Sequence, residues 1–183
     1  MTWFKGLAGF EERSPDQVRK NITIDGENLT SHVNGTTLTC GRLEILSLAE
    51  LREQAHSARH GSGELSLREV VADVQGLHLD VSNAGALFQV ASQFNLLEMA
   101  SPSAIPEHGV GIYEYDHTQG PACAIAAGAG TIYRNYFVPV HGQIGQSKGN
   151  QIDCLEELGR MSRAQQGLHI LARVWGTQLA SRH

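Results

Sequence analysis

The chain has 183 residues and a formal net charge of −5, and 41% of its residues are hydrophobic while 18% are charged. A single domain of this size buries roughly 70% of its unfolded surface, so its core requires neither disulfide bonds nor a structural metal. Its three cysteines, Cys40, Cys123 and Cys154, are odd in number and lack CxxC spacing, which argues against a disulfide framework and a zinc site and predicts a reducing compartment.

The first residues carry Lys5 and run directly into Glu11-Glu12-Arg13, so they lack the apolar stretch of a signal peptide, and we expect a cytoplasmic protein. The longest low-charge stretch, residues 120–133, is too short to cross a bilayer, which predicts no membrane partner. Between Arg68 and Arg134 there is no Lys or Arg, although seven acidic residues lie there. Because nucleic-acid binding normally needs clustered cations, no nucleic-acid partner is expected.

The N-terminal third predicts β-hairpins. Short alternating runs at residues 22–24, 37–39 and 43–45 are separated by Asp25-Gly26 and Asn34-Gly35, and glycine supplies the positive φ that a tight turn needs. Ser47 and Glu50 then form a capping-box pattern that predicts a helix of roughly three turns ending by His60.

The second part of the chain reads as alternating strands and helices. Residues 70–79 have the pattern of a buried strand, residues 86–94 of a short helix, and residues 96–99 of a further strand. A proline-containing loop is expected at 101–109, an exposed loop at 138–151, and an amphipathic helix over 152–161. This order predicts an α/β domain over residues 66–183, with residues 1–65 as an N-terminal hairpin and helix extension packed on it.

The small-residue segment that follows Asp116 admits two structures. In the first, Thr118 caps a helix with Pro121 in its first turn, and the positive end of the helix dipole lowers the pKa of the Cys123 thiol. In the second, residues 122–126 form a strand and Gly128-Ala-Gly130 a loop whose amides hold an anion. The shortage of cations in this region favours the second structure.

Two groups of side chains are candidates for chemistry. Cys123 with His108, His117 or His141 could form a nucleophile and base, with Gln119 as an oxyanion donor. Arg134 is the only cation near the glycine-rich segment, and it either binds a carboxylate or phosphate or pairs with a nearby acid. Neither a metal site nor a cofactor is expected, because the histidines do not pair at ligand spacing.

The run from Leu77 through Asn83-Ala-Gly85 to Phe94, followed by Gly128-Ala-Gly-Thr-Ile-Tyr133, resembles the macrodomain family and its poly(ADP-ribose) glycohydrolase branch. The resemblance implies a mixed sheet flanked by helices, binding of ADP-ribose or a related NAD-derived nucleotide, and hydrolysis of ADP-ribosyl bonds. It places Asn83 near the distal ribose, Gly128 and Gly130 at the diphosphate, and Tyr133 beside the ribose. The acid or base would be Glu98 or Asp116. The expected ligand-binding residues are Asn83, Gln89, Gln93, Asn95, Thr118, Gln119, Gly120, Gly128, Gly130, Thr131, Tyr133 and Arg134.

Three functions therefore stand side by side. The leading one is a macrodomain-like domain whose partner is an ADP-ribose-like nucleotide or an ADP-ribosylated protein. The second is a cysteine-dependent hydrolase or transferase that acts on an amide or ester through Cys123 and a histidine. The third is a non-catalytic interaction module in which the Ala/Gly segment forms a close-packed interface.

Overall fold

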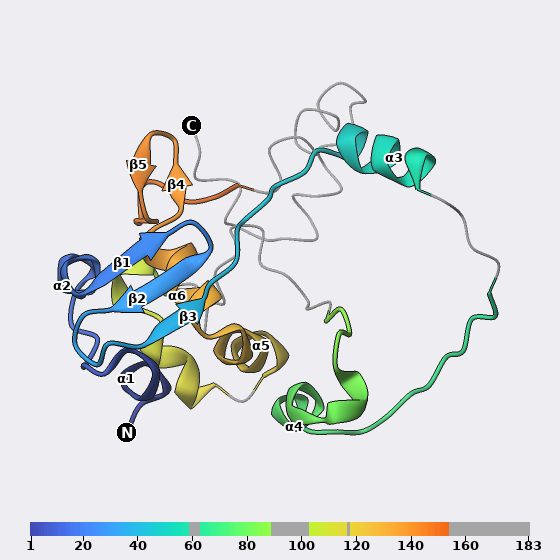
Figure 1. Cartoon of the computed structure of the whole chain (residues 1–183), viewed down its shortest axis with the longest axis horizontal. Helices are drawn as coiled ribbons and strands as arrows, with labels where there is room; N and C mark the ends of the chain where they lie inside the picture. Colours follow the sequence, from blue (N-terminus) through green and yellow to red (C-terminus); the bar gives the residue numbers. More distant parts are fainter. Residues whose placement is uncertain (59–62, 89–102, 117, 154–183) are drawn as a thin grey trace.

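Short helices and short antiparallel strands follow one another in groups along the chain (Figure 1). The computed structural model describes residues 1–58, 63–88, 103–116 and 118–153. The α-helices are α1 (Trp3–Ala8), α2 (Pro15–Asn21), α3 (Leu48–Ser57), α4 (Val74–Leu79), α5 (Gln119–Ala127) and α6 (Ala129–Tyr136). The strands are β1 (Ile22–Asp25), β2 (Asn28–Ser31), β3 (Thr37–Thr39), β4 (Pro139–Val140) and β5 (Gln143–Ile144). Short 3-10 helices cover Val81–Asn83, Pro106–His108 and Gly111–Tyr115.

The predicted N-terminal hairpins are confirmed. Strands β1, β2 and β3 form an antiparallel sheet in which Leu29 pairs with Ile24 on one side and Leu38 on the other. Gly26 and Gly35 adopt φ values of +57° and +70°, the left-handed conformation expected of the turns. The expected strand at residues 43–45 is not formed, and these residues follow the sheet without regular structure.

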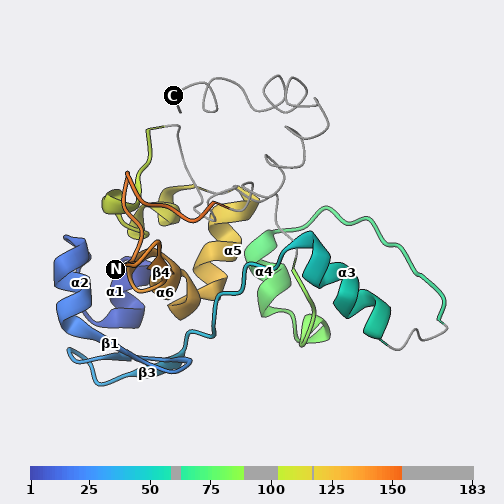
Figure 2. The same ribbon diagram turned by 90° about the horizontal axis from the view of Figure 1, so that it is seen from above.

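One hydrophobic core joins the two halves of the sequence. Phe4 from α1, Val18 from α2 and Leu29 from β2 are fully buried together with Ile132 and Tyr136 from α6. Figure 2 shows α1, α2 and α6 gathered on the same side of the sheet. Residues 1–40 therefore supply much of the core against which α5 and α6 pack, while the division of the chain at residue 65 stays a prediction.

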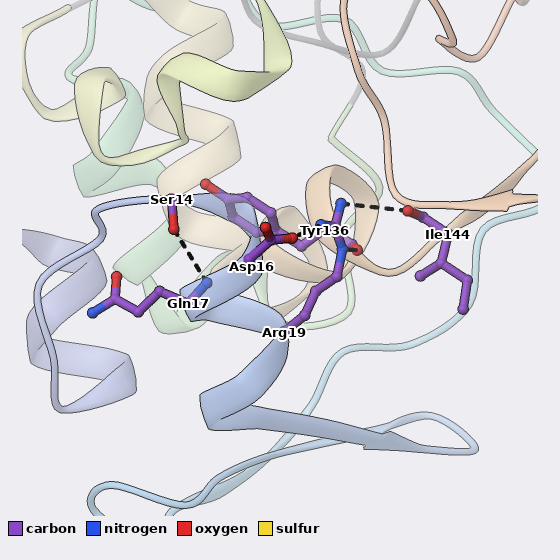
Figure 3. Close-up of polar contacts among 6 residues, drawn as sticks. All are labelled: Ser14, Asp16, Gln17, Arg19, Tyr136 and Ile144. Atoms are coloured by element: carbon purple, nitrogen blue, oxygen red, sulfur yellow. Dashed lines mark hydrogen bonds and ion pairs between the residues drawn. The ribbon is translucent and has the colours of Figure 1, made fainter.

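Arg19 fastens α2 to the C-terminal part of this core (Figure 3). Its Nε donates to the carbonyl of Tyr136 at 3.1 Å, and its Nη2 donates to the carbonyl of Ile144 at 3.4 Å. Ser14 caps the start of the same helix by accepting from the amide of Gln17. A single side chain thus donates to carbonyls at the end of α6 and in β5, and it links α2 to both of these elements.

The strand expected at residues 70–79 is wrong. Residues 66–73 are exposed without regular structure, and α4 begins where the Asp73 carboxylate accepts from the amide of Gly76 at 3.0 Å. This side-chain cap competes successfully with strand formation because no neighbouring strand in the described residues offers backbone partners. Of the helix expected at 86–94, residues 86–88 are not helical and the remainder lies outside the described residues, as does the strand at 96–99.

The fold is therefore mixed helix and strand, as expected, but it differs in its sheets. Within residues 63–88, 103–116 and 118–137 there is no strand, and both sheets of the described chain are antiparallel. The mixed, helix-flanked sheet implied by the macrodomain resemblance is not confirmed. Strands β4 and β5 form a hairpin whose neighbourhood buries Val138 and Gln146, so residues 138–151 are not the exposed loop that was expected.

The sequence also predicts a capped helix after Ser47 and an amphipathic helix over residues 152–161. The capping box of Ser47 and Glu50 is confirmed at the start of α3, which ends at Ser57 and lies away from the sheet in Figure 1. Of the helix expected at 152–161, residues 152 and 153 are not helical, and the remainder lies outside the described residues. Every helix in the described part of the chain is too short or too polar to cross a membrane.

Candidate functional site

A cavity of about 330 Å³ lies where α4 meets α5 and α6. Three helices and the residues that follow α4 supply its walls, and several of the lining residues are small, so the side chains between them remain accessible. The residues that line it are His78, Phe88, Gly120, Cys123, Ala124, Ala126, Ala127, Thr131 and Arg134. Four of these, Gly120, Cys123, Thr131 and Arg134, are site residues predicted from the sequence.

The helical form of the small-residue segment is confirmed, and the alternative with a strand at 122–126 is wrong. Helix α5 starts after Thr118, as predicted, but the Thr118 side chain makes no capping hydrogen bond to the helix. The amide and the hydroxyl of Thr118 instead both donate to Asp116 Oδ1, at 2.9 and 2.6 Å. Pro121 lies in the first turn, where its missing amide hydrogen costs no helical bond. Gly128 separates α5 from α6 and Gly130 lies inside α6, so these residues do not form an anion-binding loop.

A thiol and an imidazole meet in the cavity. Cys123, in the second turn of α5, is half-buried, and its Sγ lies 3.2 Å from Nε2 of His78 in the last turn of α4. Phe88 stacks on the imidazole with ring centroids 3.9 Å apart and an interplanar angle of 22°. The stacked ring restricts rotation of the imidazole and keeps Nε2 directed at the sulfur. A histidine at this distance can remove the thiol proton and produce the nucleophilic thiolate.

Arg134 forms another part of the cavity wall. Arg134 lies on α6, and its Nε and Nη2 are buried without a hydrogen-bond partner in the described part of the chain. Its carbonyl accepts from Nε2 of Gln146 at 3.2 Å, which ties the backbone of α6 to the C-terminal hairpin region. The ion pairs formed among the described residues join Lys5 to Glu11, Arg19 to Asp16, and Arg42 to Glu44. Of the two roles expected for Arg134, pairing with an acid is thus not observed among the residues that the structure describes.

Thr131 and Gly120 also line the cavity. Thr131 is buried, and its hydroxyl donates to the carbonyl of Ala124 at 2.5 Å, which holds α6 against α5. Gly120 lies in the first turn of α5, where amides have no acceptor within the helix.

Several expected site residues lie elsewhere. Asn83 donates to the carbonyl of Leu77 at 2.9 Å and holds the turn after α4, Thr118 and Gln119 are exposed, and Tyr133 packs against the hydrophobic core. A side chain at Gly130 would meet the carbonyl of Cys40 at 3.2 Å, so this glycine permits helix packing. None of these lines the cavity. Four others fall outside the described residues: Gln89, Gln93, Asn95 and Glu98.

The histidine beside Cys123 differs from those expected. His108 accepts from the amide of Ile105 at 3.4 Å, His141 contacts Asn150 at 2.9 Å, and His117 is outside the described residues. His78 was missed because the Leu-His-Leu run was interpreted as a strand. Asp73 directly before Val74 was the available signal, since aspartate is a preferred N-cap and would have predicted a helix carrying His78.

Cys123 differs from Cys40, the other described cysteine, in its exposure to solvent. Cys40 is buried in the core, its Sγ donates to the carbonyl of Glu27 at 3.3 Å, and burial raises the pKa of its thiol. No group of three or more His, Cys, Asp and Glu side chains that could hold a metal occurs in the described residues. Comparisons with protein-family models, curated proteins and solved structures found no match.

Proposed function

We propose that this cavity is the active site of a cysteine-dependent hydrolase or transferase acting on an amide or ester. Cys123 is the nucleophile and His78 is the base. The observation that carries the proposal is the 3.2 Å contact between Cys123 Sγ and His78 Nε2 inside an accessible cavity. Nucleophile and base within hydrogen-bond reach are the geometric requirement for this type of catalysis.

The reaction proceeds in two steps. His78 Nε2 takes the proton from Cys123 Sγ, and the resulting thiolate attacks the carbonyl carbon of the substrate, forming a carbon–sulfur bond. The carbonyl re-forms as the bond to the amine or alcohol breaks, and the imidazolium returns its proton to that leaving group. In the second step His78 removes a proton from water or from an acceptor alcohol or amine, which attacks the thioester and releases Cys123, the sulfur recovering its proton from His78.

The negative charge that develops on the carbonyl oxygen needs a hydrogen-bond donor. Gln119 was expected in this role, but its side chain is exposed and does not line the cavity. We assign the role to the backbone amide of Gly120, because it lies in the first turn of α5 and its residue lines the cavity beside Cys123.

Alkylation by iodoacetamide tests the proposal. In the folded chain near neutral pH we expect Cys123 to react faster than Cys40 and Cys154, and replacement of His78 by Ala to slow that reaction by roughly a hundredfold, a typical loss on removal of a base. His56→Ala is the matched control, because His56 lies on α3 and is exposed. Mass spectrometry of the alkylated peptides identifies the cysteine that reacts.

Two results would contradict the proposal. One is alkylation of Cys40 or Cys154 as fast as that of Cys123. The other is an equal rate for Cys123 in the parent chain and in His78→Ala, with both proteins shown to be folded by circular dichroism.

Binding of ADP-ribose stays a prediction. This hypothesis requires a strand and a glycine loop where the structure has helices α5 and α6. Its remaining support is that Nε and Nη2 of Arg134 have no acceptor among the described residues. Calorimetry with ADP-ribose, NAD and AMP at millimolar concentration tests it, and no heat of binding for any of them would reject it.

The interaction-module hypothesis predicts a concentration-dependent dimer without a thermal shift from small molecules.

A further inference from the structure

Two buried nitrogen atoms of the half-buried Arg134 side chain indicate the kind of substrate that the cavity accepts. We propose, resting on the function proposed above, that the substrate of Cys123 carries an anionic group of carboxylate or phosphate geometry, and that Arg134 binds this group. Arg134 and Cys123 line the same cavity from successive helices, α6 and α5. Arg134 would then act as a specificity-determining residue, separate from the thiol and imidazole that perform the reaction.

An unpartnered guanidinium in a protein interior is costly and therefore informative. A guanidinium group carries a positive charge at physiological pH, so its buried N–H groups need acceptors. Its Nε and Nη2 are shielded from solvent and have no hydrogen-bond acceptor in the described residues. Because buried charges are normally paired, this arrangement indicates an acceptor that enters from outside the chain.

The acidic side chains nearest in sequence do not supply that acceptor. In the stretch without Lys or Arg, five described carboxylates accept from backbone amides elsewhere: Asp73 from Gly76, Asp80 from Ser82, Glu107 from Lys148, Glu114 from Trp3, and Asp116 from Thr118. Each of these carboxylates stabilises a turn or a helix start. None of these five described carboxylates is therefore the acceptor of the buried Arg134 N–H groups.

The shape of the group and of the cavity limits the ligand further. The Nε and Nη2 atoms of one guanidinium point in parallel and match the two oxygens of a carboxylate or phosphate. A volume of about 330 Å³ lies at the small end of the usual range for ligand cavities, roughly 300 to 1,000 Å³. We therefore expect a small acyl compound with an anionic group a few bonds from its scissile carbonyl.

Pairs of alkylating agents that differ only in charge test this inference. Iodoacetate and longer ω-haloacids carry a carboxylate, and their amides have nearly the same shape without it. For each pair we divide the rate of Cys123 alkylation by the acid by the rate with the amide. We expect this acid-to-amide ratio to be roughly tenfold higher in the folded chain than in the urea-unfolded chain, because a charge-assisted hydrogen bond contributes about that much. The rate with the best acid should also saturate with concentration, because the anion binds before it reacts.

Two arginine variants provide the matched comparison. Arg134→Gln should lower the acid-to-amide rate ratio of Cys123 to its value in the urea-unfolded chain, and circular dichroism checks that this variant is folded. Arg42→Gln should retain the preference, because Arg42 is exposed and pairs with Glu44 at 2.9 Å outside the cavity.

Protection experiments separate the two anion classes. Propionate that slows alkylation of Cys123 by iodoacetamide in the parent chain, but not in Arg134→Gln, indicates a carboxylate substrate, and inorganic phosphate that does so indicates a phosphate substrate. A fast iodoacetamide reaction without any preference for acids would overturn this inference and leave the proposed nucleophile and base intact. If Cys123 shows no activation toward iodoacetamide, the proposed function itself fails, whereas Arg134-dependent protection by an anion can still be measured.

Discussion

At the scale of single residues, Glu12 connects parts of the chain that lie about a hundred positions apart. Its carboxylate accepts from the amide of Val110 at 3.0 Å, from the amide of Gly111 at 2.6 Å, and from the hydroxyl of Tyr136. A side chain at Gly109 would collide with this carboxylate at 2.5 Å, so the backbone approaches Glu12 more closely than any other residue type would permit. Glu12 thereby anchors α6, the helix that carries Arg134.

Replacing Glu12 by Ala leaves two amides and a buried phenol without their acceptor. Since hydrogen bonds to a charged group contribute about 1.5–3 kcal/mol each, we expect a loss of roughly 3 kcal/mol or more in the free energy of unfolding. Urea denaturation measures it. Glu11→Ala is the matched control and should change stability little, because Glu11 is exposed and pairs with Lys5 at the surface. Equal midpoints for the two variants would contradict the anchoring role of Glu12.

At the scale of elements, the turn between α5 and α6 determines how the cavity is built. Gly128 adopts φ +51° and ψ −106°, and a side chain there would meet Cδ1 of Leu7 at 3.1 Å. This sharp junction turns the chain within one residue, so Cys123 on α5 and Arg134 on α6 can face the same space. The glycine that the sequence suggested as an anion ligand is instead required by backbone conformation.

Gly128→Ala should destabilise the protein by about 1–3 kcal/mol, because alanine is strained at this φ and its Cβ crowds Leu7. Chemical denaturation of the purified variant gives the value. Gly6→Ala is a control of opposite sign, since Gly6 lies inside α1 with open space around it and alanine favours helix. A Gly128→Ala variant as stable as the parent would show that the turn does not depend on glycine.

At the scale of the whole molecule, the core responds to alkaline pH. Burial and the neighbouring Glu12 carboxylate raise the pKa of the Tyr136 phenol well above its ordinary value, and burial raises the pKa of the Cys40 thiol. Both groups are neutral when protonated, and unfolding returns them to their ordinary values near 10 and 8.5. Their contribution to stability is therefore complete below those values and is lost as the pH rises above them.

We accordingly expect the free energy of unfolding to fall as the pH is raised from about 9 to 11, where the unfolded chain loses protons that the folded chain retains. Tyr136→Phe should lower stability at neutral pH, because Glu12 loses a hydrogen-bond donor. It should also flatten the dependence on pH, because phenylalanine has no hydroxyl proton to lose. Tyr115→Phe should leave the dependence as it is, since Tyr115 is exposed. Identical pH profiles for the parent and Tyr136→Phe would contradict the assignment.

Local signals in the sequence were sufficient for part of this structure. The turns at Gly26 and Gly35 and the capping box of Ser47 and Glu50 were predicted correctly, because each depends on residues within a few positions of one another. The helix over residues 119–127 was one of two alternatives, and the sequence favoured the other one. A run of small residues fits either a helix or a strand, and its packing partners decide between them.

The sequence by itself determined the N-terminal hairpins, the capped helix α3 and the residue types Cys123 and Arg134 as candidates for chemistry. Only the tertiary structure decided that His78, forty-five positions away, contacts Cys123, and that Arg134 lines the same cavity with its Nε and Nη2 buried and without an acceptor in the described residues. The reason is physical: turns and caps are stabilised by neighbours in sequence, whereas a cavity forms where distant helices pack, and its chemistry depends on which side chains that packing brings together.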